Sequence, residues 1–330
     1  MSSSETEIIL EFDGKEVTEE KKADITVLKY IDSDEMHIDD LQIITKNKEI
    51  LSDVLEIKLT IKKNNWNGTG ISKVMDCGKF TVDDEECDFE NELYIIKASA
   101  VTPLSEIRQS ARSQAWERFN LKEVAQEIAR RNEVNIIYAA QSNPVFARKE
   151  QICESDIFFL SRVCRTAGLR LKFTNDSLVI YDPYERSREN PVRVFREGET
   201  DISESRLYHR KDDTDYAKCR VSYMDLVKKE LIEHIYKRKE NGRMIEVRQK
   251  VSSTEEASLL AKYIIREKNS KEYTGYLVCS GDISLAVGNI IALSGYGEYD
   301  RKYIITKSIQ KLNLGLHTTA IWFEMVTEGY

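Results

Sequence analysis

The sequence predicts an α+β protein, mostly β, in which two strand-rich ends flank a small central module. Three observations predict this class. Short alternating segments with turn residues between them fill residues 1–100 and 274–326. Residues 119–182 contain, in order, a helix, a strand, a helix and a hairpin. A faint repeat relates the two strand-rich ends, and the length of 330 residues allows two or three domains.

The first hundred residues contain strand signals and no helical period over three turns. Strands are predicted at 7–12, 23–31, 37–45, 55–61, 77–82 and 92–101. In the fourth of them, Leu55, Ile57, Leu59 and Ile61 fall on one face at period two. Strands this close together, with turns such as Asp13-Gly14 between them, indicate an antiparallel barrel or sandwich.

The central module follows residues 102–115, which we interpret as a polar connector that is partly helical. Asn120 is a suitable helix cap and Glu123 completes a capping box. One apolar stripe follows: Leu121, Val124, Ala125, Ile128 and Ala129. A strand is predicted at 134–138, a second helix from Ser155 to Gly168, and a hairpin over 169–181. This unit of roughly 65 residues is near the lower limit for independent folding.

The last part begins after a polar stretch at 184–189, the second predicted boundary. Strands are predicted at 192–195, 216–224, 274–279, 288–293, 303–312 and 318–326. Between them, Asn241-Gly242 predicts the turn of a charged hairpin, and a helix is expected over 254–266. We therefore predict an N-terminal β-barrel (1–104), a central α+β module (105–183) and a C-terminal β-barrel (184–330), the last with the charged hairpin and helix inserted at about 227–275.

The repeat joins two similar runs of residues. Gly78, Phe80 and Val82 precede Tyr94, Ile95, Ile96 and Ser99; Gly281, Ile283 and Leu285 precede Tyr303, Ile304, Ile305 and Ser308. The spacing differs between the two runs, and β-rich sequences also match by chance. A true duplication would mean two copies of one barrel on either side of the central module.

The net charge of −8 is unevenly distributed. Residues 1–105 carry 24 acidic and 12 basic side chains, whereas residues 106–330 carry 33 and 37. An acidic surface repels nucleic acid, so we predict no specific nucleic-acid binding. The acidic surface either keeps the protein soluble or lines a path along which a polyanion passes without binding. No apolar run of about 18 residues predicts a membrane span, and the start of the chain lacks a secretory signal, so we expect no membrane partner and a protein that is made and kept in a cytoplasm.

Motifs for catalysis, cofactors or metals are missing. The six cysteines form no CxxC pair, the four histidines have no ligand spacing, and there is no GxSxG, GxxxxGK[ST] or helix-opening GxGxxG. Gly295-Tyr-Gly297 is expected to be a turn. Three charged clusters are interpreted as solvated loops or a hairpin rather than metal or nucleic-acid sites: 83–88, 211–215 and 228–240. We therefore predict no catalytic, cofactor-binding or metal residue, no cofactor and no enzyme activity. A glycosidase pair of carboxylates stays open, because such a pair is defined by its distance in space and not by its spacing in the sequence.

The central block resembles the late control protein D family, the central baseplate hub proteins of phage tails and contractile injection particles. The resemblance rests on residues 116–125, Glu150-Gln151, residues 154–160 and Ala167-Gly168-Leu169, in the order that the family shows. It is best over about 116–182, looser through 216–224 and 254–266, and limited to strand pattern in the first hundred residues. It implies two tail-tube-like barrels in each chain and a homotrimeric ring that adapts a hexameric tail tube to a trimeric spike. The implied partners are other copies of the chain, the spike, the tube or tube-initiator protein, other baseplate proteins and the tape measure. The implied location is the baseplate of a virion or a phage-tail-like particle.

Two other functions stay open at this stage. Residues 116–182 could form a peptidoglycan-binding module, and the chain could be a tail-associated cell-wall hydrolase. The even distribution of the aromatic residues argues against both carbohydrate functions.

Overall fold

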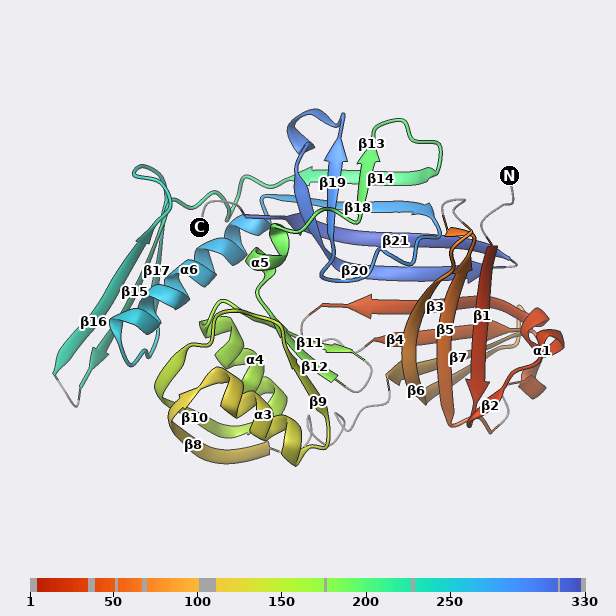
Figure 1. The fold of residues 1–330 in the computed structure, drawn as a ribbon, viewed down its shortest axis with the longest axis horizontal. Coiled ribbons are helices and arrows are strands. Elements are labelled where there is room, and N and C mark those ends of the chain that lie inside the picture. Colours follow the sequence, from red (N-terminus) through yellow and green to blue (C-terminus); the bar gives the residue numbers. More distant parts are fainter. Residues whose placement is uncertain are drawn as a thin grey trace.

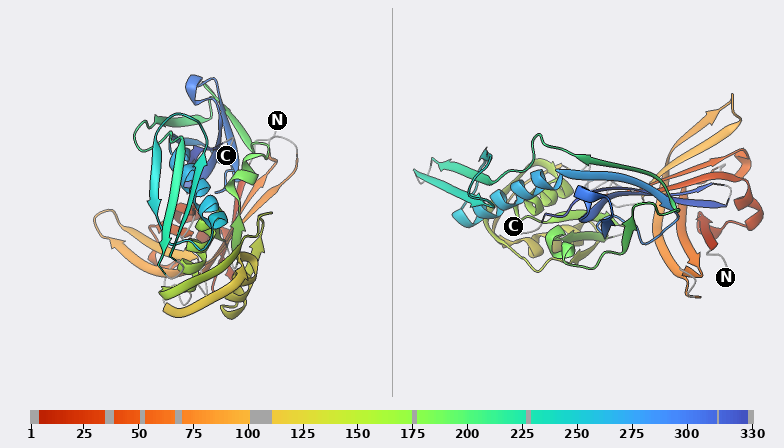
Figure 2. Two further views of the ribbon diagram at one scale, coloured as in Figure 1. Left: turned by 90° about the vertical axis from the view of Figure 1, so that its left-hand side faces the viewer. Right: turned by 90° about the horizontal axis from the view of Figure 1, so that it is seen from above.

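The computed structural model describes residues 5–34, 39–50, 53–66, 70–100, 111–174, 177–226, 229–313 and 315–327. The molecule is elongated: the N-terminal strands lie at one end, and a small sheet packed on helix α6 (Thr254–Ser270) lies at the other (Figure 1, Figure 2). A 13-stranded main sheet and three smaller sheets make up its β structure. The prediction of a mostly β protein with few helices is confirmed. Among the described helices, none combines the length and the apolar character needed to cross a lipid bilayer.

The N-terminal part supplies seven strands to the main sheet. They are β1 (Glu5–Phe12), β2 (Lys15–Glu16), β3 (Ile25–Ser33), β4 (Asp40–Thr45), β5 (Glu56–Asn64), β6 (Lys73–Asp88) and β7 (Leu93–Ala100), with the short helices α1 (Glu19–Ala23) and η1 (Lys48–Ile50). The six predicted strands are present. Ile57, Leu59 and Ile61 are fully buried as their period predicts, but Leu55 is 72% exposed. Leu55 precedes β5, and its backbone N–H donates to the carboxylate of Asp13 instead of joining the ladder.

The acidic stretch 83–88 is not a turn, so that prediction is wrong. It continues β6 and pairs with β7. Lys97 of β7 lies 3.3 Å from the Asp84 carboxylate and 3.0 Å from the Glu86 carboxylate. These cross-strand opposite charges explain how so acidic a segment can stay in a strand.

The central module folds around its own apolar core. Its elements are β8 (Ala111–Asn120), α3 (Leu121–Arg131), β9 (Asn135–Tyr138), β10 (Val145–Ser155), α4 (Asp156–Thr166), β11 (Arg170–Thr174) and β12 (Ser177–Tyr181). The Asn120–Glu123 capping box and the Ser155 cap are confirmed. The helical prediction for the connector is wrong over 111–115, which belongs to β8, and 102–110 lies outside the described residues. β10 was not predicted, because the β8–β10 ribbon is mostly polar and its pairs are held partly by charge, as between Arg148 and Glu117.

The C-terminal part returns to the main sheet. Its elements are α5 (Pro183–Ser187), β13 (Arg193–Arg196), β14 (Ile202–His209), β18 (Tyr273–Ser280), β19 (Ile290–Ser294), η3 (Gly297–Tyr299), β20 (Lys302–Asn313) and β21 (Leu316–Met325). The boundary stretch contains an unpredicted helix, α5, capped by Asp182 with Pro183 in its first turn. Only half of the repeat has matching structure: β7 and β20 are both strands, but residues 78–82 lie in β6 whereas 281–285 lie outside any strand.

The charged insertion forms a separate three-stranded sheet with α6 on one face. The strands are β15 (Lys218–Asp225), β16 (Glu230–Lys237) and β17 (Met244–Arg248). β15 lies in the middle, antiparallel to β16 and parallel to β17. The prediction of a hairpin turn at Asn241-Gly242 is therefore wrong, because β16 and β17 do not pair with each other. Cys219 and Val221 alternate inward as predicted and pack with Leu260 and Ile265 of α6.

One pairing joins the two strand-rich ends. β3 pairs antiparallel with β20 from Ser33–Lys307 to Val27–Asn313, so the N-terminal and C-terminal strands form one continuous sheet. The strand order contains no closed barrel among the described strands. The three-part division and the two-barrel arrangement remain predictions.

Candidate functional site

The candidate site is a junction of buried charges. It lies where the end of β3, the hairpin β11–β12 of the central module and the C-terminal strands meet. On β11, Leu171 and Phe173 point into the core of the module. The strand period of two therefore turns Arg170 and Lys172 the other way, toward the main sheet. Both cations meet acidic side chains there.

Arg170 joins three parts of the chain. Its Nη1 donates to Asp34 Oδ2 at 2.7 Å and its Nη2 donates to Glu324 Oε1 at 2.5 Å. The Tyr181 hydroxyl donates to the other Asp34 oxygen at 2.9 Å. Burial opposes the charge of Arg170, but Glu324 and Asp34 outweigh it and raise the pKa of the guanidinium. The planar fork of arginine lets one side chain bind two carboxylates from different strands.

Lys172 makes the second contact of the junction. Its Nζ donates to Asp32 Oδ1 at 2.6 Å, and the backbone N–H of Val287 donates to Asp32 Oδ2 at 2.8 Å. Asp32 is 2% exposed, so the carboxylate needs these partners. Through Asp32 the central module is tied to β3 and to the loop before β19.

A third acid, Asp39, lies close to Asp32 and has a perturbed pKa. The Tyr30 hydroxyl donates to Asp39 Oδ2 at 2.8 Å and the Ser33 backbone N–H donates to Oδ1 at 3.3 Å. Burial and the charge of Asp32 raise the pKa of Asp39 to about 7, although Lys172 opposes the shift. Asp39 is therefore the proton-sensitive member of the junction near neutral pH.

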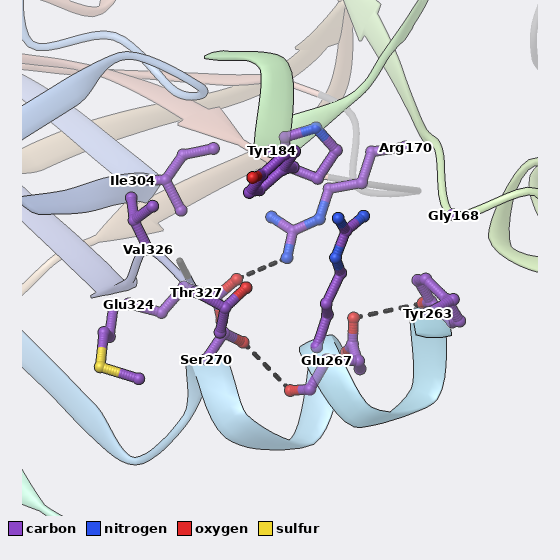
Figure 3. Close-up of a pocket in the computed structure, with 13 residues that line it drawn as sticks. Gly168, Arg170, Tyr184, Tyr263, Glu267, Ser270, Ile304, Glu324, Val326 and Thr327 are labelled. Carbon is purple, nitrogen blue, oxygen red and sulfur yellow. Dashed lines mark hydrogen bonds and ion pairs between the residues drawn. The ribbon is translucent and has the colours of Figure 1, made fainter. Parts of the chain in front are cut away.

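A small cavity adjoins the junction and shows what the site can hold. Figure 3 shows Arg170 directed toward Glu324, with Tyr184 of α5 and Glu267 of α6 also lining the space. The cavity has a volume of about 50 Å³, which suits a few water molecules. Small-molecule sites are several times larger. The arrangement holds parts of the chain together and offers no substrate pocket.

A second buried pair ties the central module to the insertion. Lys149 of β10 donates to Glu256 in the first turn of α6, and both side chains are buried. The other Glu256 oxygen accepts from the Ser252 backbone N–H at 3.0 Å. Both faces of the central module are therefore held by buried ion pairs whose partners lie far away in the sequence.

Comparison of the chain with known protein families identifies the family. Residues 46–312 match the model of the phage tail baseplate hub (GPD) family. The chain belongs to this family. It is a structural protein of a phage-type tail, and its place is the baseplate.

Solved structures share the fold of this hub protein at low sequence identity. The 43 kDa tail protein of prophage MuSo2 from Shewanella oneidensis is 13% identical, with a TM-score of 0.71 over 96% of this chain and 98% of that one. The tail protein from Neisseria meningitidis MC58 is 11% identical, with a TM-score of 0.72 over 97% and 96%. The prophage tail protein gp18 from Listeria monocytogenes EGD-e is 12% identical, with a TM-score of 0.65 over 96% and 94%. A search of curated proteins found no match.

The acidic residues of the cluster at 211–215 form ion pairs with lysines of the insertion and of α6. Asp213 pairs with Lys268, and Asp215 lies 2.7 Å from Lys239. No group of metal-ligating side chains occurs in the part of the chain that the structure describes. Gly295 and Gly297 occupy left-handed conformations in a turn, as expected. Of the four histidines, His37 lies outside the described residues.

Sequence reasoning missed the junction itself. Asp32 and Asp34 follow the strand predicted at 23–31, whereas Asp32 lies inside β3. One signal was available: Arg170 and Lys172 alternate with apolar residues in a hairpin that has to be covered on both faces. Their partners are more than a hundred residues away in the sequence, which no local pattern encodes.

Proposed function

We propose that this chain forms the trimeric ring of a baseplate hub, adapting a hexameric tail tube to a trimeric spike. Two strand-rich ends in each chain would give three copies six similar units facing the tube, while the three-fold symmetry matches the spike. The observation that carries the proposal is the continuous main sheet, which fuses the two ends through the β3–β20 pairing. The two tube-like barrels and the division at 1–104, 105–183 and 184–330 belong to this proposal.

The edges of the main sheet support assembly with further copies. At one edge, β14 pairs only with β18. At the other, β1 pairs on its outer side with β2 at Glu11 and Phe12, and the Leu10 carbonyl accepts from the Val17 backbone N–H at 2.8 Å. The stretch from Glu5 to Ile9 has no outer strand in the described chain. Exposed strand edges favour pairing with another chain. A head-to-tail ring closes all such edges.

The other proposed partners are the tube or tube-initiator protein, neighbouring baseplate proteins and the tape measure, with assembly in the bacterial cytoplasm. No specific observation on the described residues supports a carbohydrate-binding or a hydrolase function. In the central module, Trp116 stacks on Phe159 with ring centroids 6.0 Å apart and is not presented as a sugar platform.

The mass of the purified chain tests this proposal. Light scattering would be recorded for the chain alone and after adding the spike protein encoded beside it. We expect about 115 kDa, three times the chain mass of 38.2 kDa, or a 3:3 complex on mixing. A chain that stays monomeric and ignores the spike would overturn the ring proposal.

A further inference from the structure

Among the described elements, only α6 packs on the small sheet of the insertion, and it covers one of the two faces. α6 covers the face that carries Cys219 and Val221. The opposite face, here called the outer face, carries four apolar side chains: Met224, Leu231, Ile235 and Met244. The same face carries the ion pairs of Arg220 with Glu233 and Glu246, together with Lys218, Lys237 and Arg248. Each of the four apolar side chains is between 39% and 53% exposed. The outer face points away from the body at one end of the molecule (Figure 1).

The register shows how apolar and charged side chains alternate on this face. Met224 of β15 lies directly opposite Leu231 of β16, whereas Ile235 lies opposite Arg220, beyond the Ser222–Glu233 pair. Met244 of β17 is paired with Lys218 on the other side of β15. Exposed apolar side chains interspersed with arginine and other charged groups are typical of a protein contact surface.

The charge around the outer face is positive. Residues 237–250 contain six basic and two acidic side chains. The opposite end of the elongated molecule carries the complementary charge (Figure 2): residues 83–92 contain seven acidic side chains and no basic one. Next to them, Phe89 at the β6–β7 turn is 86% exposed and Leu55 is also exposed.

We propose that the outer face docks on the acidic β6–β7 hairpin (residues 73–100) of a second copy of this chain, so that neighbours in the ring meet basic end to acidic end. Apolar side chains are available on both sides of this contact, and the charges around them are opposite. The contact is heterologous, the type that repeats around a closed ring. This inference rests on the proposed ring and names one of its interfaces.

The size of the outer face sets the strength of the contact. Two strands of eight residues and one of five cover roughly 330 Å², less than half of the about 800 Å² that each partner buries in a stable interface. The docking therefore acts together with the pairing of sheet edges. Because its rim is charged, it sets the rate and salt dependence of association more than the total affinity.

Charge reversal on the full chain tests the inference. The variants are Lys237→Glu/Arg248→Glu on the outer face and Asp83→Lys/Glu85→Lys on the hairpin; all four side chains are exposed. Sedimentation, with the spike added if the ring requires it, should show each pair weakening assembly about tenfold at low salt. The variant carrying all four changes restores complementary charges and should return to within about threefold of the natural chain. The matched control Lys122→Glu/Arg130→Glu changes the net charge as much as the outer-face variant, at two exposed positions of the central module, and should assemble normally.

A second measurement, chemical cross-linking, uses the natural chain and needs no variant. Carbodiimide joins carboxylates to lysines in contact, and a mixture of isotope-labelled and unlabelled chains identifies links between copies. Mixed-isotope links between residues 237–250 and 83–92 are the expected result. Links from 237–250 only to the spike, or assembly unaffected by either reversal, would overturn the docking while leaving the ring intact. No self-assembly of the natural chain, with or without spike, would remove the ring and the docking together.

Discussion

Two buried polar clusters lie along the main sheet, and they differ in chemistry. At the end of β3, Asp32 and Asp34 bind cations of another module. At the start of β21, His317 contacts Gln310 Oε1 through Nε2 at 2.8 Å and Thr6 Oγ1 through Nδ1 at 3.1 Å. The first cluster is charged and joins separate modules, whereas the second contains hydroxyls, an amide and an imidazole within one sheet.

The difference indicates what each cluster is for. A buried ion pair contributes little net stability compared with apolar packing, but breaking it is costly because one charge loses its partner. Such pairs therefore penalise a wrong arrangement of modules more than they reward the right one. The His317 cluster connects β1 to β21, which are not neighbours in the sheet. Each strand is held in its own backbone ladder, β1 by β5 and β21 by β20. The cluster therefore needs no ion pair; Lys63 adds only a hydrogen bond to Thr6 Oγ1 at 2.9 Å.

The largest expected effect comes from removing the cation of the charged cluster. Arg170→Met keeps the volume but leaves Asp34 and Glu324 buried without their cation. We expect the free energy of unfolding to fall by about 3–5 kcal/mol in urea titration. Arg170→Lys keeps the charge and loses the two-pronged geometry, so it should lose less. A change below about 1 kcal/mol in Arg170→Met would show that the modules are held by apolar contacts alone.

The His317 cluster is best tested by adding volume next to the imidazole ring. A Cβ added at Gly281 would lie 2.1 Å from Cγ of the His317 ring, so the ring has to move. Gly281→Ala should destabilise the chain by about 1–3 kcal/mol through overpacking. Ser280→Ala, at the exposed neighbouring residue, is the control and should unfold like the natural chain. Equal stability of the two variants would mean that the His317 cluster adapts freely.

The sequence predicted the local parts of this architecture and missed its long-range parts. Asn120 and Ser155 cap helices with side chains that reach three residues ahead, a distance that a sequence pattern contains. Arg170 reaches Asp34 across 136 positions, and nothing near either residue identifies the other. The strand signal was clear where one face is apolar, as in β5, and absent where pairing is held by charges, as in β8 and β10. For the same reason the acidic end of β6 was interpreted as a turn.

The two clusters should respond to pH with opposite sign. Asp39 has its pKa raised to about 7, so between about pH 4 and 7 the folded chain keeps a proton that the unfolded chain has lost. The free energy of unfolding therefore falls as the pH rises from about 4 to 7. Burial and Lys63 lower the pKa of His317 to about 4. The unfolded chain therefore takes up a proton below about pH 6.5 that the fold rejects, and stability falls as the pH falls.

Single variants separate the two responses. Asp39→Asn should remove the loss toward neutral pH, and His317→Gln should remove the loss toward acid. Each should change the slope of the unfolding free energy by an amount on the order of 1 kcal/mol per pH unit between about pH 4 and 6.5. Urea titrations at several pH values measure this slope. Parallel curves for the natural chain and both variants would mean that neither group titrates differently in the folded state.

The smallest effect is expected for an ion pair that lies outside both clusters. Arg220 of β15 donates through Nη2 to Glu233 of β16 at 2.6 Å, a shorter contact than the 2.7 Å bond from Arg170 to Asp34. Arg220 nevertheless lies on the solvent side of the small sheet, where water solvates both charges and salt screens them. Arg220→Ala should leave the urea midpoint unchanged within error, at low salt as well as high. If Arg220→Ala were as costly as Arg170→Met, contact distance rather than burial would govern these pairs, and the distinction between the charged junction and the exposed sheet would fail.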